Sequence, residues 1–417
     1  MTRWRLRLLR LPVLLFSLSA SVLEAQERLI GRHTLAGGAS FESITFGAGG
    51  LRQTAFAGID SARVTRASQF TLPVTAITPL GGGWRLDVTV LYARGRVTYR
   101  QDGVPGSDRI STLSGLSDVR LRASGRFLWD ALTLTFGANA PTGRTSLSGA
   151  EFSTLRVLAA PALGMGSSPV GAGAGGTMGA VYGRHAGAWD IAFGASYEHR
   201  GRFQPVAALL AGAPSSDFRP GAVMRASLGA DRSVGPHRVS FVATADVFAD
   251  DKLRAATDSG TAGGGAIRTL ATVRLGPVLT ADAQLLLAAA RFRELIVYSS
   301  FLWRAPYARD GRTEAGSSGQ YLAGGLRAAV PLAAHGDLIV AGEGRWHSGL
   351  GVDQGLPTAG VRSASLTLGL DARRGLLSLQ PYVRAQAGIL QQRGGSTAVP
   401  NQSFAGIAGG LVLITRF

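Results

Sequence analysis

Six histidines are the side chains of this sequence best suited to acid–base chemistry near neutral pH. A hydrolase needs such a histidine beside a carboxylate or a serine, so that water or a hydroxyl is activated as a nucleophile. His185, His237 and His335 stand at or next to expected short turns, where a solvated turn residue is the simpler interpretation. His199 and His347 stand at the ends of expected strands, but no spacing of Ser, Asp and His defines a triad. We therefore predict no catalytic residue and no enzyme.

Metal and cofactor sites are not indicated either. The chain has no Cys and its histidines are scattered, which leaves no zinc pattern. Asp250, Asp251 and Asp258 offer oxygens to a hard cation, but not at the spacing of an EF-hand. The glycine-rich run 171–176 lacks the Lys-Ser or Lys-Thr that completes a phosphate-binding loop. We expect no bound metal and no cofactor.

The N-terminus has the layout of an export signal. Arginines at positions 3, 5, 7 and 10 precede the apolar stretch 11–23, and Ala25 is a small residue at a cleavage site. Cleavage after Ser21 is the alternative. We expect a signal peptide at 1–25 and one domain at 26–417. The formal net charge of +17 would suit nucleic acid, but the arginines are dispersed and the signal directs export, so we expect no nucleic-acid partner. A genomic codon bias accounts equally well for arginine over lysine.

Apolar and polar residues alternate along most of the chain. In the segment 84–92, WRLDVTVLY, every even position is apolar, while Arg85, Asp87 and Thr89 are polar. A period of two is that of a β-strand with one apolar face. The same pattern recurs at 119–127, 132–136, 189–197, 238–247, 365–373 and 377–389.

Two architectures produce this alternation, a soluble sandwich and a membrane barrel. The polar face mixes Arg with Asp, Thr, Ser, Gln and Gly, as in a water-filled barrel interior. Trp84 and Tyr92 stand at the two ends of one apolar face. At about 3.3 Å per residue and a tilt near 40° they are separated by roughly 20 Å along the membrane normal, close to the apolar band of an outer-membrane barrel. We therefore predict an all-β, transmembrane, antiparallel up-and-down barrel.

Connection lengths support the barrel. Short turns are expected at 79–83, 129–130, 186–187, 235–236, 276–277, 334–336 and 374–375, and they alternate with longer links at 48–68, 101–114, 142–170, 201–218, 251–264, 293–319, 349–360 and 391–402. Tight periplasmic turns and long outer loops alternate in this way in outer-membrane barrels. The links divide the chain into about 16 strands, from 35–47 to 403–417. If the first segment and a weak strand near 265–275 are not part of the wall, 14 strands are equally allowed.

Charged residues on the polar face are candidates for lining the channel. Those we expect to face the lumen are Arg85, Asp87, Arg120, Arg122, Arg126, Asp190, Glu198, Arg225, Asp231, Arg238, Asp246, Arg268, Arg274, Asp282, Arg327, Glu343, Arg345, Asp371, Arg373 and Arg384. Arginines outnumber acids in this set, which predicts a preference for anions. The loop 142–170 is apolar enough to fold into the mouth as a constriction or capture loop, through Phe152, Leu155, Val157, Leu158 and Met165.

Two segments resemble a known hairpin. The segments GLSDVRLRASGRF at 115–127 and LTLTFGANAPTG at 132–143 are similar to the Gly-Leu-Gly-Asp-Val strand and the Lys-Leu-Pro-Thr-Gly strand end of the phenol meta-pathway transporter family. Those proteins are distant relatives of the long-chain fatty-acid transporter barrels. Ser117 replaces the middle glycine, and Asn139-Ala140 replace Lys-Leu. The resemblance implies a barrel for passive uptake of small apolar or aromatic compounds.

The C-terminal GLVLITRF is similar to the last strand of outer-membrane barrels. Leu411, Leu413 and the terminal Phe417 share one face, as in the signal that barrel-assembly machinery recognises, although Thr415 stands where an apolar residue is usual. We expect an outer-membrane channel of a diderm bacterium, with membrane lipid, the assembly machinery and a small solute as its partners. A structural or adhesion barrel that transports nothing is the alternative.

Overall fold

The computed structural model describes residues 33–53, 56–57, 59, 61–104, 106–144, 146–160, 163–165, 170–171, 173–202, 216–256, 267–333, 336–348, 358–392 and 401–416. The expected signal peptide, His335 and Phe417 lie outside these residues.

Sixteen antiparallel strands form a closed barrel. The wall strands are β1 (Thr34–Phe46), β3 (Ala62–Gly81), β4 (Trp84–Gln101), β6 (Val119–Phe127), β7 (Leu132–Ala140), β8 (Gly175–Ala186), β9 (Trp189–Arg200), β11 (Val223–Val234), β12 (His237–Phe248), β15 (Val278–Ala289), β16 (Phe292–Arg304), β19 (Gly319–Ala333), β20 (Gly336–Ser348), β21 (Thr358–Arg374), β22 (Leu377–Gln392) and β23 (Gln402–Arg416). β23 pairs with β1 from Thr34↔Arg416 to Phe46↔Phe404. The prediction of 16 strands is confirmed, and the alternative of 14 is wrong.

Alternation along the strands separates two faces of the wall. On β23, Phe404 and Ile414 are buried, whereas Ile407 is 62% exposed and Leu411 and Leu413 are each 42% exposed. Large apolar side chains are exposed in the same way on nearly every wall strand, as is typical of the lipid-facing band of a membrane barrel. The apolar face is therefore the outside of a membrane barrel. No helix among the described residues is long and apolar enough to cross a membrane.

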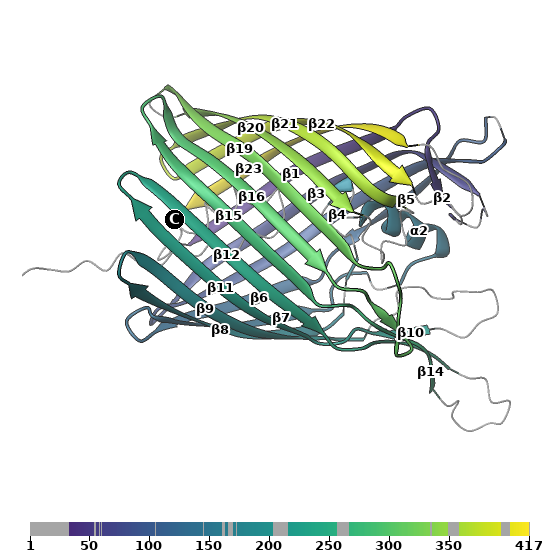
Figure 1. Cartoon of the computed structure of the whole chain (residues 1–417), viewed down its shortest axis with the longest axis horizontal. Coiled ribbons are helices and arrows are strands. Elements are labelled where there is room, and N and C mark those ends of the chain that lie inside the picture. The colour runs from purple at the N-terminus through teal and green to yellow at the C-terminus, as the bar shows by residue number, and fades with distance from the viewer. Residues whose placement is uncertain are drawn as a thin grey trace, which may run out of the picture.

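Short and long connections lie at opposite ends of the barrel (Figure 1). The C-terminus lies at the end with short turns, whereas β2 (Leu51–Gln53), β5 (Arg109–Leu116) and the helix α2 (Gly149–Leu158) lie toward the end with long loops. Several expected links differ from the structure, and 48–68 includes the first residues of β3. The Gly276-Pro277 pair leads into β15 at the long-loop end, and the short turn is instead Ala290-Arg291. Residues 293–304 of the expected link 293–319 are wall strand, in β16, and 101–114 contains part of β5.

A second sheet extends beyond the wall at the long-loop end (Figure 1). It consists of β10 (Ser216–Arg219), β13 (Asp251–Ala256), β14 (Ile267–Arg274), β17 (Ala308–Arg309) and β18 (Arg312–Thr313). Arg268 and Arg274 lie on β14, so their predicted position in the barrel wall is wrong. Alternation alone did not separate wall strands from this sheet, because an external hairpin has the same period of two.

The pairing of β1 with β23 can be tested because the chain has no native Cys. Ala39 and Leu411 are directly opposite partners, and opposite residues have Cα atoms about 4.5 to 5.5 Å apart, within disulfide range. We expect Ala39→Cys/Leu411→Cys to oxidise to an intramolecular disulfide, measured by loss of maleimide labelling after unfolding. In the control Ala39→Cys/Val412→Cys the second cysteine points to the other face. Equal oxidation of the two variants would contradict the register.

Candidate functional site: the barrel lumen

The helix α2 packs on the inside of the wall. Val157 and Leu158, both fully buried, join one apolar cluster with residues of six consecutive strands: Val97 of β4, Ala67 of β3, Ile44 of β1, Phe404 of β23, Leu390 of β22 and Val361 of β21. The helix itself contacts β3, β4 and β5, and the cluster continues from there along the concave side of the wall. The cluster therefore places α2 in the lumen, toward the long-loop end.

A capping box begins α2. The Ser148 hydroxyl accepts a hydrogen bond from the Glu151 backbone N–H, and the Glu151 carboxylate accepts one from the Ser148 N–H at 2.9 Å. Arg144 donates to both carboxylate oxygens at 2.6 and 2.7 Å. Burial raises the pKa of Glu151, but these hydrogen bonds outweigh it and hold the pKa below its usual value. Their contribution to helix stability is therefore present at neutral pH and is lost as the pH falls through that lowered pKa.

The base of this loop is tied to a break in the wall. β4 pairs with β6 over residues 84–89 and with β5 over residues 92–99, and Ser117 and Asp118, between β5 and β6, are buried. Asp118 Oδ1 accepts a hydrogen bond from the Gly143 N–H at 3.0 Å. A Cβ on Gly143 would lie 2.8 Å from the Asp118 nitrogen and from the Gly171 Cα, so only glycine fits. The two halves of the Ser-Asp-Val and Pro-Thr-Gly motif thus meet in space.

The segment after α2 extends across the lumen. Leu163 and Met165 are buried in the same cluster as α2. A Cβ on Gly164 would lie 2.4 Å from Arg345 Nη1 on β20. Of the predicted capture residues, Val157, Leu158 and Met165 are buried, while Phe152 and Leu155 are partly exposed. We call 147–160 and 163–165 the plug. Whether the plug captures a solute stays a prediction.

Most predicted lumen arginines are paired with carboxylates. Arg225 donates to both oxygens of Asp246 at 2.6 and 2.7 Å. The other pairs are Arg238 with Asp231, Arg327 with Glu294, Arg345 with Glu343, Arg373 with Asp371, and Arg384 with Glu42. The Tyr298 hydroxyl also donates to Glu343, at 2.8 Å. Much of the positive charge expected on the wall is therefore locally neutralised.

Sequence reasoning missed Glu42, Glu294 and Tyr298 as partners in these pairs. Glu42 and Arg384 are both buried and lie 342 positions apart in the sequence. Their proximity depends on barrel closure, because β1 contacts β23 and β23 contacts β22. Glu42 was nevertheless detectable, since it is the only charged residue of β1 and shares the face of Ile44 and Phe46.

A less compensated group lies on β4 and β6. Arg85 is 3.7 Å from Asp87, and Arg120 and Arg122 are exposed on β6. We call Arg85, Asp87, Arg120 and Arg122 the basic strip. Nearby, Arg126 is 3.9 Å from Asp130 at the turn. Asp282 lies on β15, opposite Ser300.

The histidines show no catalytic arrangement among the described residues. His185 Nδ1 is 2.9 Å from Asp190 Oδ1 at an exposed turn. Asp190, which was predicted to line the lumen, therefore lies near the short-turn end. His347 is 2% exposed and contacts the Tyr321 ring edge-on at 6.3 Å. Within the described residues no group of three or more His, Asp and Glu side chains is placed to hold a metal.

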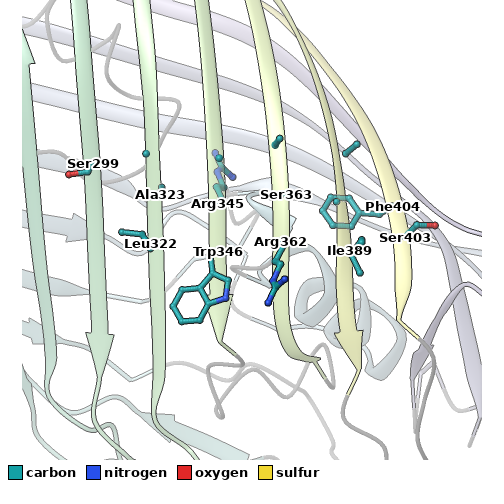
Figure 2. A pocket seen from close by; sticks show the side chains of 15 residues that line it. Ser299, Leu322, Ala323, Arg345, Trp346, Arg362, Ser363, Ile389, Ser403 and Phe404 are labelled. Carbon is teal, nitrogen blue, oxygen red and sulfur yellow. The ribbon is translucent and has the colours of Figure 1, made fainter.

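A shallow hollow lies across β16 and β19 to β23 (Figure 2). Its volume is about 890 Å³, and the small residues Gly324, Gly344 and Ala364 form a row across three strands beside the row of Leu322 and Trp346. Leu322 is 46% and Trp346 39% exposed, so this side of the hollow belongs to the apolar outer face and not to the lumen.

Comparisons with solved structures find outer-membrane barrels of similar extent. Pseudomonas putida OprB at high pH is 11% identical, with 96% of this chain and 97% of that chain covered and a TM-score of 0.44. A deltaS2 mutant of the TodX monoaromatic hydrocarbon channel is 8% identical (93% and 90% covered, TM-score 0.45), and an outer membrane channel from Pseudomonas putida F1 is 13% identical (93% and 96%, TM-score 0.35). No family model and no curated protein sequence matches the chain. The barrel assignment therefore rests on the strand pairing of the chain itself.

A substitution at Gly95 tests whether Leu158 of the plug packs against β4. A Cβ on Gly95 would lie 2.0 Å from Leu158 Cδ1. We expect Gly95→Val to loosen α2 by about 1 to 3 kcal/mol, as overpacking of a tight contact does. Trypsin should then cut at Arg156 faster than in the wild type.

Two further variants control for other effects of a valine. Gly137→Val, on β7 where the nearest atom to a new Cβ is 3.4 Å away, should leave the cutting rate unchanged. Gly95→Val/Leu158→Ala should restore slow cutting because it removes the clashing atoms. If Gly95→Val were as resistant as the wild type, α2 would not be seated on Gly95.

Proposed function

We propose that the chain is an outer-membrane channel for passive uptake of small apolar or aromatic compounds. The plug supports this proposal. The helix α2, packed on the wall through Val157 and Leu158, narrows the lumen, and the partly exposed Phe152 and Leu155 offer apolar surface along the path. A simple pore for hydrophilic ions needs no apolar segment at that position. The resemblance of 115–143 to the phenol meta-pathway transporter family points to the same class of solute, and membership of that family is part of the proposal.

The location and biogenesis belong to the same proposal. The exported chain would cross the outer membrane with its short turns in the periplasm and its long loops outside. Leu411, Leu413 and Phe417 would be the signal read by the assembly machinery.

The alternative is a structural or adhesion barrel with a closed lumen. The buried pairs Glu42–Arg384 and Glu343–Arg345 favour it locally, because both bury charged side chains inside the barrel. The exposed Arg120 favours the channel, since a fully packed lumen would bury it or pair it with a carboxylate.

Removal of the plug distinguishes the channel from the structural barrel. We expect replacement of 147–165 by a short Gly-Ser linker to raise ion conductance in planar bilayers, because the lumen is unblocked. Uptake of a labelled phenol at limiting concentration by cells expressing the variant should fall about tenfold, the loss of roughly 1.4 kcal/mol of binding. The anchor between Asp118 and Gly143 is retained in this variant. A structural barrel would show no uptake in either form, and uptake that rises with conductance would argue against capture by the plug.

The basic strip is expected to set ion preference. Arg120→Gln/Arg122→Gln removes two positive charges and should lower the anion-to-cation permeability ratio, measured as the reversal potential in a KCl gradient. Arg225→Gln/Asp246→Asn removes one charge of each sign from a paired site and should leave the ratio unchanged. If the two variants behaved alike, the strip would not determine selectivity.

A further inference from the structure

Some arginines of this barrel lie on its outside. Gly95 faces the lumen, because its Cβ direction meets Leu158 of the plug. Arg94 and Arg96 flank Gly95 on the same strand and therefore face outward. Ala67 of β3 is in the lumen cluster, so the adjacent Arg66 also faces outward. All three arginines are exposed. We call Arg66, Arg94 and Arg96 the outer arginine group.

Cross-strand pairing arranges their surroundings in three rows on the outer face. The first row is Phe41, Phe70, Arg94 and Ser114; the second is Ser43, Ser68, Arg96 and Thr112; the third is Thr45, Arg66, Thr98 and Ile110. Leu72, Tyr92 and Leu116 form the apolar row just before them. Moving toward the long-loop end, the surface thus changes from apolar to aromatic with arginine, and then to hydroxyl with arginine.

These arginines differ from those of the lumen in their partners. Among the residues that the structure describes, no carboxylate is within ion-pair distance of Arg66, Arg94 or Arg96, and Arg66 Nε donates to the Ser43 hydroxyl at 2.8 Å. None of the three rows contains Asp or Glu. Arg66 and Arg96 are diagonal neighbours, with Cβ atoms about 7 Å apart. Such unpaired charge favours an anion with several acceptor oxygens.

The position of the outer arginine group along the membrane normal indicates which anion it meets. Tyr92 is at the outer end of the apolar band that begins at Trp84. Arg94 and Arg96 lie roughly 5 and 10 Å beyond Tyr92 along the membrane normal, which is the depth of the headgroup layer outside the hydrocarbon core. Long arginine side chains can bend along the wall to reach charged groups in that layer.

We propose that the outer arginine group binds the phosphate of anionic lipid headgroups on the long-loop side of the membrane. The hydroxyls of Ser68, Thr112 and Ser114 lie in the same rows and can donate to further phosphate oxygens. Phe41 and Phe70 contact the first part of the acyl chains. This surface does not depend on transport, and a barrel that transports nothing would still bind lipid here.

The test measures lipid retained by the full barrel in neutral detergent. Native mass spectrometry counts bound phosphatidic acid, a phosphomonoester lipid, against phosphatidylcholine with the same acyl chains. We expect Arg94→Gln/Arg96→Gln to bind phosphatidic acid about tenfold more weakly than the wild type, since two positive charges that attract the anionic headgroup are removed. Heat-modifiable gel migration confirms that each variant is folded.

The matched control removes the same charge elsewhere. Arg309→Gln/Arg312→Gln lies on the exposed β17–β18 hairpin, beyond the wall, and should leave binding within about twofold. Equal losses in the two variants would overturn the proposal, because the effect would then be one of net charge. If inorganic phosphate at the same concentration displaced the bound phosphatidic acid, the site would be assigned to a free anion instead of a lipid.

Discussion

Backbone hydrogen bonding is the constraint on which the rest of this structure depends. A strand in lipid has no water to satisfy its N–H and C=O groups, so each edge must be paired. Pairing of β1 with β23 along thirteen registered positions removes the last edge. That closure requires an even number of strands when both ends of the barrel domain lie at one end. It also creates an interior, and the plug and the buried charge pairs exist only within it.

The contact of Asp118 with Gly143 and Gly171 fixes the base of the plug loop inside the barrel. The break between β5 and β6 leaves the buried Asp118 facing the base of the plug loop, and Gly143 and Gly171 approach it too closely for any side chain. From this fixed base the capped helix α2 extends along the wall, and Gly164 ends beside Arg345. Wall geometry and plug position are therefore coupled, because Asp118 lies at the break between the strands and its carboxylate holds the loop.

Alternation was sufficient for the architecture and insufficient for its details. A period of two identified the outer apolar face, and Leu411 and Leu413 lie on it as expected. The same period misplaced Arg268, since a strand of the external sheet alternates as a wall strand does. The 293–319 error had another cause. Charged residues open this segment, but Arg293 lies 3.0 Å from Asp337, two strands away, and Arg327 lies 2.6 Å from Glu294 on the neighbouring strand. Contacts between strands distant in sequence could not be read from one strand at a time.

The charge pattern follows from where water is available. Within the lumen, arginines face other polar residues at short range, and pairing with Asp or Glu offsets the loss of hydration. On the outside there is no facing wall, so Arg94 and Arg96 have only the membrane and its surface as surroundings. An arginine below the row of Tyr92 would have to enter hydrocarbon, at a cost of about 2 to 4 kcal/mol near the midplane and far less near the interface. The outer arginine group begins just where that cost becomes small. The same residue type thus stabilises a packed interior on one face and can interact with headgroups on the other, and alternation along β4 decides which role each arginine has.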